Sequence, residues 1–168
     1  MVRKGIILIL TLAIVGYSYF YYHQSSFFKS YVPSKFGPLE EVGMCTTGWL
    51  LGGWGNAVFR FDEATQAEIQ KEGLAYFSND MQSIRLPQLL GRDRIEISYN
   101  SWRKLQASDT SDGLPVGFNC SGGISRDEQL RLLQAMRTNA GYVSGSNSHG
   151  TLYVIPQLRL VFYSYMDH

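Results

Sequence analysis

The sequence is poor in the residues that bind transition metals. Of its three histidines, His23 lies beside the hydrophobic N-terminal segment and His168 is the last residue, so only His149 lies inside the expected domain. The two cysteines, Cys45 and Cys120, are expected to be bonded to each other. Zinc prefers three or four ligands, which these residues do not supply. We therefore expect no metal centre, and no motif indicates a cofactor.

Charge of either sign is also scarce. Charged residues make up 17% of the 168 residues, and the formal net charge is +1. No basic stripe is present that could neutralise phosphates, so nucleic acid is not an expected partner. Hydrophobic residues make up 45%, which is too many for a disordered tail. The composition is that of one folded domain of about 145 residues behind the N-terminal segment.

The one long uncharged run lies at the N-terminus, in residues 5–22. As a helix it would reach about 27 Å, close to the roughly 30 Å of a membrane's hydrocarbon core. Its aliphatic part, residues 6–15, would also suit the apolar region of a cleavable signal peptide. The run therefore predicts export to the membrane, either as a retained anchor or as a signal peptide.

Two features favour the retained anchor. Gly16 and Ser18 are the best candidates for a cleavage site, and they match an A-x-A pattern poorly. The aromatic residues at 17 and 19–22 resemble the belt of rings that sits at the level of the lipid headgroups. Arg3 and Lys4 precede the run, which places the N-terminus in the cytoplasm and the domain outside, periplasmic or extracellular.

The chain divides into three expected segments. Residues 1–23 form the anchor or signal peptide, and residues 42–168 form an extracytoplasmic domain. Between them, residues 24–41 contain two prolines and no clean period, which predicts a tether without regular structure. Its aromatic residues are too many for a free linker. Part of the tether is therefore expected to lie on the membrane surface or against the domain.

Capping residues predict two helices. Asp62 is a candidate N-cap, and Gly73 is the candidate C-terminal stop of a short surface helix. Ser125 and Glu128 form an S-x-x-E capping box ahead of an amphipathic helix at 126–139. Leucines and Met136 share one face of that helix, which predicts that it packs on the core.

Short alternating runs predict strands in the rest of the domain. Three single strands are expected at 58–61, 74–77 and 94–98, and a closing three-stranded meander at 142–144, 151–155 and 158–165. The last strand carries bulky residues on both faces, so we expect it to be central or covered. The fold class is therefore α+β: an antiparallel sheet of four to six short strands with one main helix packed on it.

The two cysteines lie in the exported part of the chain. In an oxidising compartment such a pair most simply forms a disulfide, and closing this loop would stabilise the fold by roughly 4 kcal/mol in the chain-entropy model. The alternative is two free thiols. Cys120 lies in GFNCSGG, directly before the capping box of Ser125, where a helix N-terminus can activate a thiol.

The candidate binding residues are Trp49, Trp54, Asn56 and His149. The tryptophans lie in a glycine-rich block that precedes a strand and lacks the Lys-Ser/Thr pair of a phosphate loop. Their rings could instead form a platform for a sugar or a partner side chain. His149 lies in a polar hairpin loop, where it could act as a general base with a nearby serine.

With the catalytic signals weak, the sequence favours a binding module. Aromatic residues make up 14% of the chain, including eleven tyrosines, and such rings dominate recognition surfaces. We expect a membrane-tethered domain that binds another envelope protein, or a glycan, as an accessory subunit or an inhibitor or immunity-like protein. The alternative is a small envelope hydrolase or thiol enzyme that uses His149 or Cys120.

Overall fold

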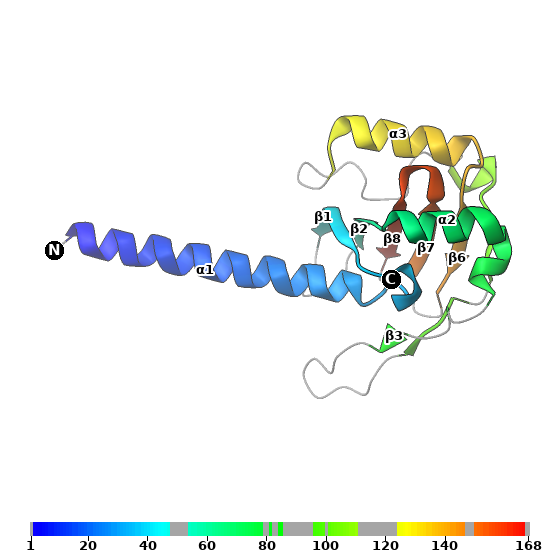
Figure 1. Cartoon of the computed structure of the whole chain (residues 1–168). Helices are drawn as coiled ribbons and strands as arrows, with labels where there is room; N and C mark the ends of the chain where they lie inside the picture. Colours follow the sequence, from blue (N-terminus) through cyan, green and yellow to red (C-terminus); the bar gives the residue numbers. More distant parts are fainter. Residues whose placement is uncertain are drawn as a thin grey trace.

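The computed structural model describes residues 2–47, 54–78, 81, 84–85, 96–99, 101–110, 124–146 and 150–166. A long N-terminal helix, α1 (Val2–Lys29), leads into an α+β domain built on an antiparallel sheet (Figure 1). The fold class predicted from the sequence is confirmed. The other elements follow in chain order: η1 (Ser34–Phe36), β1 (Glu40–Thr47), β2 (Trp54–Arg60), α2 (Glu63–Glu72), η2 (Gly73–Phe77), β3 (Ile84–Arg85), β4 (Glu96–Ile97), β5 (Arg103–Lys104), η3 (Ala107–Thr110), α3 (Arg126–Arg137), β6 (Tyr142–Gly145), β7 (Gly150–Ile155), η4 (Pro156–Leu158) and β8 (Leu160–Met166).

The main sheet has six strands in the order β1-β2-β8-β7-β6-β5, with each neighbouring pair antiparallel. The predicted C-terminal meander is confirmed as β6, β7 and β8. The last strand is central, as expected, because it lies between β2 and β7. A separate pair, β3 with β4, forms a two-stranded sheet.

Side-chain alternation along the central strands divides the core between the two faces of the sheet. In β8, Val161 and Tyr163 belong to one buried cluster, whereas Leu160 and Phe162 belong to the other. Successive side chains of a strand point to opposite faces, so this strand is covered on both sides. The helix α3 packs on the Phe162 face. The end of α1, together with α2 and η2, contributes to the Val161 face.

The two predicted helix starts are confirmed. Asp62 accepts a hydrogen bond from the backbone N–H of Thr65 at 2.8 Å, and α2 ends at Gly73, whose φ is positive. The Ser125 hydroxyl accepts from the backbone N–H of Glu128 at 3.2 Å at the start of α3. These side chains satisfy backbone donors that the helix itself leaves without partners.

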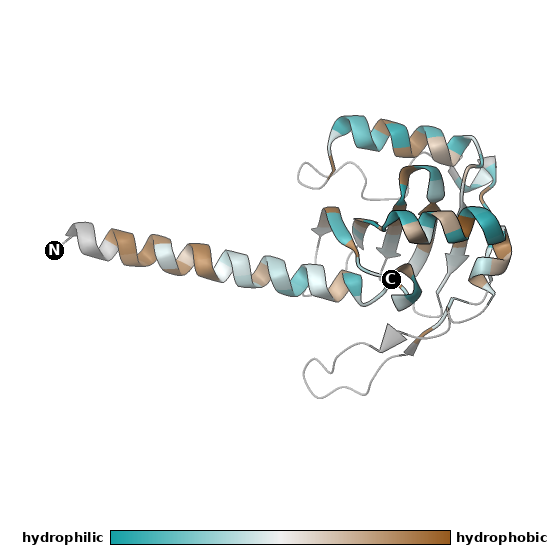
Figure 2. Ribbon diagram, in the orientation of Figure 1, coloured by the Kyte–Doolittle hydropathy of each residue, from teal (hydrophilic) through white to brown (hydrophobic). Residues whose placement is uncertain are grey.

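The helix α1 changes character along its length. Its N-terminal half is apolar and its C-terminal half more polar, as Figure 2 shows. Long aliphatic and aromatic side chains from Ile6 to Tyr22 are exposed, and the segment Ile6–Lys29 is long and apolar enough to cross a membrane. By the end of the helix the pattern reverses, because Gln24, Ser25 and Phe28 are buried against the domain.

Two secondary-structure predictions were wrong. Residues 24–41 are not irregular throughout: α1 continues through Lys29, η1 forms a helical turn, and β1 begins at Glu40. Phe28, Tyr31 and Phe36 of this segment belong to the buried core, which confirms that part of it lies against the domain. Residues 74–77 form the 3₁₀ helix η2 rather than a strand, because Gly73 turns the chain and Tyr76 and Phe77 pack inward from consecutive positions.

Candidate functional site

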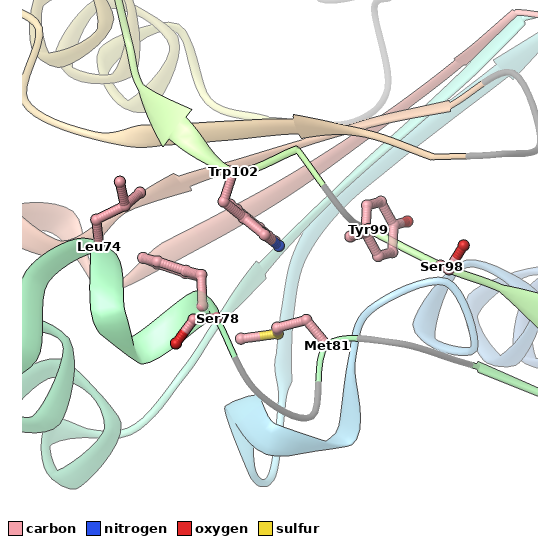
Figure 3. A pocket seen from close by; sticks show the side chains of 7 residues that line it. Leu74, Ser78, Met81, Ser98, Tyr99 and Trp102 are labelled. Atoms are coloured by element: carbon pink, nitrogen blue, oxygen red, sulfur yellow. The ribbon is translucent and has the colours of Figure 1, made fainter.

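A pocket of about 610 Å³ is lined in part by η2, a turn that lies on the opposite side of the domain from the free end of α1 (Figure 1). The described residues that line it come from three parts of the chain: η2 with the residue after it, Met81, and the chain around β4 and β5 (Figure 3). Its lining residues are Leu74, Phe77, Ser78, Met81, Ser98, Tyr99 and Trp102. This volume lies within the range of about 300–1,000 Å³ that is usual for ligand sites.

Buried and exposed side chains divide the pocket into a floor and a rim. Phe77, Met81 and Tyr99 are buried and form the floor, whereas Leu74 is 44% exposed at the rim. The ring of Trp102 stacks on that of Phe77, with centroids 4.3 Å apart and planes 22° apart. Stacked ring pairs of this kind stabilise one another, so Phe77 and Trp102 form one packed aromatic pair beside the pocket.

Core contacts also hold Tyr99. Its hydroxyl donates a hydrogen bond to the carbonyl oxygen of Tyr31 at 2.8 Å, and its backbone N–H donates to the carbonyl oxygen of Met81 at 3.3 Å. Burial raises the pKa of the Tyr99 hydroxyl above its ordinary value. The group is therefore a neutral donor at physiological pH, and Tyr31 joins the pocket floor to the segment that follows α1.

The indole of Trp102 carries a buried donor. Its Nε1–H is covered from solvent, and no residue in the described part of the chain accepts a hydrogen bond from it. A buried polar group left without a partner costs about 1–3 kcal/mol. Figure 3 shows the nitrogen at the end of the ring that faces the space between Met81 and Tyr99.

The segment that carries Trp102 is held by an ion pair. Arg103 donates two hydrogen bonds to the Asp109 carboxylate, at 2.7 and 2.6 Å, and the backbone N–H of Gln106 donates a third at 2.7 Å. The hydrogen bonds from Arg103 are the main reason that the pKa of Asp109 lies below its ordinary value. These three hydrogen bonds close the loop after β5 and so help to fix the position of Trp102.

The binding residues predicted from the sequence lie elsewhere. Asn56, in β2, is only 2% exposed and lies within the sheet opposite Cys45 and Ser164. The strand β2 begins at Trp54, whose side chain lies outside the described part of the structure. Trp49 and His149 lie outside it as whole residues. A shared surface formed by these four residues stays a prediction.

The predicted disulfide is described at one end only. Cys45 lies in β1, and among the described residues no cysteine is a free thiol. Cys120 and the glycine-rich loop around it are outside the described residues. The pairing of Cys45 with Cys120, and the alternative role of Cys120 as a nucleophile, therefore remain predictions. No group of three or more potential metal ligands occurs among the residues that were described.

Sequence patterns did not reveal the pocket. Its residues come from a 3₁₀ turn, a single methionine and the chain around two very short strands, none of which has a helical or strand period. The close spacing of Tyr76 with Phe77 and of Tyr99 with Trp102 is the only local sign. That sign marks aromatic content and not a pocket.

Comparison with known proteins finds no family model, no curated protein and no solved structure that matches the chain. The fold and the pocket therefore define the class of protein by themselves. It is an α+β domain with a six-stranded antiparallel sheet, carried on one N-terminal helix that could cross a membrane. That helix meets the length and composition of a single-pass anchor and also of a signal sequence.

Proposed function

We propose that this protein is a membrane-anchored binding module that recognises a partner protein outside the cytoplasmic membrane through the aromatic pocket beside η2. The pocket itself is the observation that carries this proposal. It combines packed aromatic side chains with an exposed rim, and aromatic anchors that insert into pockets contribute much of the energy at protein interfaces.

The position of the pocket supports a partner that approaches from the aqueous side. The free end of α1 and the turn η2 lie on opposite sides of the domain (Figure 1). With α1 inserted in the bilayer and Arg3 and Lys4 on the cytoplasmic side, the pocket faces away from the lipid. Such a geometry suits an accessory subunit or an inhibitor or immunity-like protein of a bacterial envelope.

The disulfide belongs to the same proposal. A domain exported by α1 folds in an oxidising compartment, where Cys45 and Cys120 pair. The absence of a free thiol at Cys45 supports this pairing. The bond would tie β1 to the chain that precedes α3.

Site-specific photo-cross-linking in intact membranes tests the binding function. Leu74 lies on the pocket rim and is 44% exposed, and Leu130 on α3 is 57% exposed on the other face of the sheet. A photoreactive residue at position 74 is expected to capture one partner protein, whereas the same residue at position 130 is not. Capture of monomer alone from position 74, or equal capture from both positions, would contradict the proposal.

A blocking variant shows whether capture depends on the pocket. Ser78 is exposed at the end of η2 and lines the pocket. The substitution Ser78→Trp should fill the opening, because the indole is far larger than a hydroxymethyl group and the position is open to solvent. We expect it to abolish capture from position 74 while leaving the unfolding midpoint of the domain unchanged.

A further inference from the structure

The chemistry of the pocket lining restricts what it can bind. Three aromatic residues, one leucine, one methionine and two serines line it, and none of these described lining residues carries a charge. A buried ionic group would lose its hydration there without gaining an opposite charge. The described lining therefore favours an uncharged group, which can combine an apolar ring with polar atoms that lie near the serines.

The hydrogen-bonding capacity of the lining is equally restricted. The Ser78 hydroxyl donates to the carbonyl oxygen of Ala75 at 2.6 Å, and the Tyr99 hydroxyl donates to that of Tyr31. Both protons are therefore engaged within the protein. The Trp102 Nε1–H is different, because none of the described residues accepts from it. An indole nitrogen is a donor only, so the ligand atom that pairs with it must be an acceptor.

We infer that the pocket binds a neutral peptide segment, inserting an aromatic side chain while a backbone carbonyl oxygen accepts a hydrogen bond from Trp102 Nε1. This inference rests on the proposed binding function and names its ligand class. A peptide supplies both groups at neighbouring positions along one chain. Because Trp102 Nε1 is covered from solvent, this inference requires a neighbouring side chain to move; Met81 lies beside the indole in Figure 3, and an unbranched methionine adapts readily.

A glycan fits the lining less well. A sugar ring stacks on aromatic residues, but each of its hydroxyl groups needs a polar partner when it is buried. The described lining contains no carboxylate, amide or guanidinium group, and two of its hydroxyl protons are already engaged. A bilayer lipid is disfavoured by position, because η2, which lines the pocket, lies away from the free end of α1 (Figure 1).

The indole resonances of the full chain provide a direct test. The protein has three tryptophans, so ¹⁵N-tryptophan labelling in lipid nanodiscs gives three indole N–H signals, and Trp102→Phe identifies that of Trp102 by its loss. N-acetyl-phenylalanine amide is the probe. We expect it to move the Trp102 signal downfield in a saturable manner, because the N–H proton gains an acceptor.

Matched compounds separate the contributions of ring and carbonyl. N-acetyl-alanine amide keeps the amide but lacks the ring, and it should bind about 10-fold more weakly or worse. Cellobiose tests the glycan and should leave the Trp102 signal in place. Trp102→Phe retains an aromatic ring without the donor, and it should weaken binding of the phenylalanine compound by about 2- to 10-fold.

Defined outcomes overturn this ligand class. The first is a Trp102 signal that does not move when the phenylalanine compound is added up to its solubility limit. The second is a shift of equal size caused by cellobiose. The third is an unchanged affinity of Trp102→Phe for the phenylalanine compound. If any of these outcomes occurs while position 74 still captures a partner, and Ser78→Trp abolishes that capture, the ligand class is wrong and the binding function stands. If the compound binds as expected but position 74 captures only monomer, the ligand class stands and the proposed function is wrong.

Discussion

At the scale of single residues, Asp109 forms a well-defined ion pair near the pocket. Its carboxylate receives two hydrogen bonds from Arg103 and one from the backbone of Gln106. Charge-assisted, two-pronged bonds of this kind are stronger and more directional than neutral ones. Since Arg103 directly follows Trp102, the ion pair holds the backbone from which the indole projects.

The lowered pKa of Asp109 predicts how stability changes with pH. A carboxyl group whose pKa falls on folding stabilises the folded state above its unfolded value of about 3.9, and this contribution is lost as the pH drops through the folded pKa. Asp109→Asn should therefore lower stability at pH 7, and the difference from wild type should shrink between about pH 4 and pH 2. Urea unfolding of the detergent-solubilised chain, followed by fluorescence across this range, measures the effect.

Arg103, the other member of the ion pair, provides the control for that experiment. Arg103→Gln should remove the same acid-sensitive contribution, and the double variant should show little additional loss. A difference between wild type and Asp109→Asn that stays constant from pH 7 to pH 2 would show that the ion pair does not set the acid response.

At the scale of elements, α1 is part of the domain and not a tether. Glu41 of β1 accepts hydrogen bonds from the hydroxyl groups of Tyr21 and Ser25, and Gln24 donates to the Thr46 hydroxyl. Further along, Tyr31 stacks on Tyr163 of the central strand with ring centroids 4.5 Å apart. One helix thus joins the apolar N-terminal segment to the middle of the sheet.

Two phenylalanines of α1 test this attachment. Phe28 is 1% exposed and packs over β2, where a side chain at Gly55 would meet its ring at 2.7 Å. Phe28→Ala should lower the free energy of unfolding by about 3–5 kcal/mol, because it leaves a cavity in the core. Phe20 is 46% exposed on the same helix, so Phe20→Ala should change stability much less. Denaturant titration of both variants in the same detergent compares them; equal losses would contradict the attachment.

The elements also show which parts of the fold the sequence could predict. Both helix starts were predictable, because capping at Asp62 and Ser125 depends on residues three positions apart. The meander was predictable because β7 and β8 alternate between two buried faces. The strand β1 was not predicted, since its glycine and threonines give no clear period and its pairing with β2 is a tertiary contact.

The candidate site was much less predictable than the fold. Trp102, Tyr99 and Phe77 were not singled out, because their proximity arises from long-range packing between segments that have no period of their own. Asn56 follows a glycine-rich block, and the structure places it in β2 with only 2% of its surface exposed. Composition drew attention to aromatic residues, but position along the chain did not indicate which of them meet.

At the scale of the whole molecule, one unbroken helix joins the domain to a segment that could cross a membrane. The exposed apolar side chains of α1 end near Tyr22, and its buried side chains begin at Gln24. Since the last turns of the helix are fixed in the core, the domain is expected to sit directly at the bilayer surface with β1 near the headgroups. The pocket then has a defined orientation toward the aqueous side.

This geometry predicts that the N-terminal segment is retained and that the C-terminus lies outside. The candidate cleavage residues Gly16 and Ser18 lie inside α1, whereas a signal peptidase favours an A-x-A site. The intact protein should therefore keep residues 1–18 by mass spectrometry and resist alkaline extraction from membranes. A phosphatase that is active only outside the cytoplasm should be active when fused after residue 168, because basic residues ahead of an apolar run, here Arg3 and Lys4, favour a cytoplasmic N-terminus.

A matched variant establishes that processing would have been seen. Gly16→Ala combined with Ser18→Ala creates an A-x-A pattern behind the aliphatic run of residues 6–15. We expect this variant to be cut after position 18 and its domain to be released, because the remaining helix is too short to span the bilayer. If the mature wild-type protein already begins after residue 18, the prediction of a retained anchor is wrong and the helix is a signal sequence. The domain would then be released from the membrane, and its pocket would have no fixed orientation relative to the bilayer.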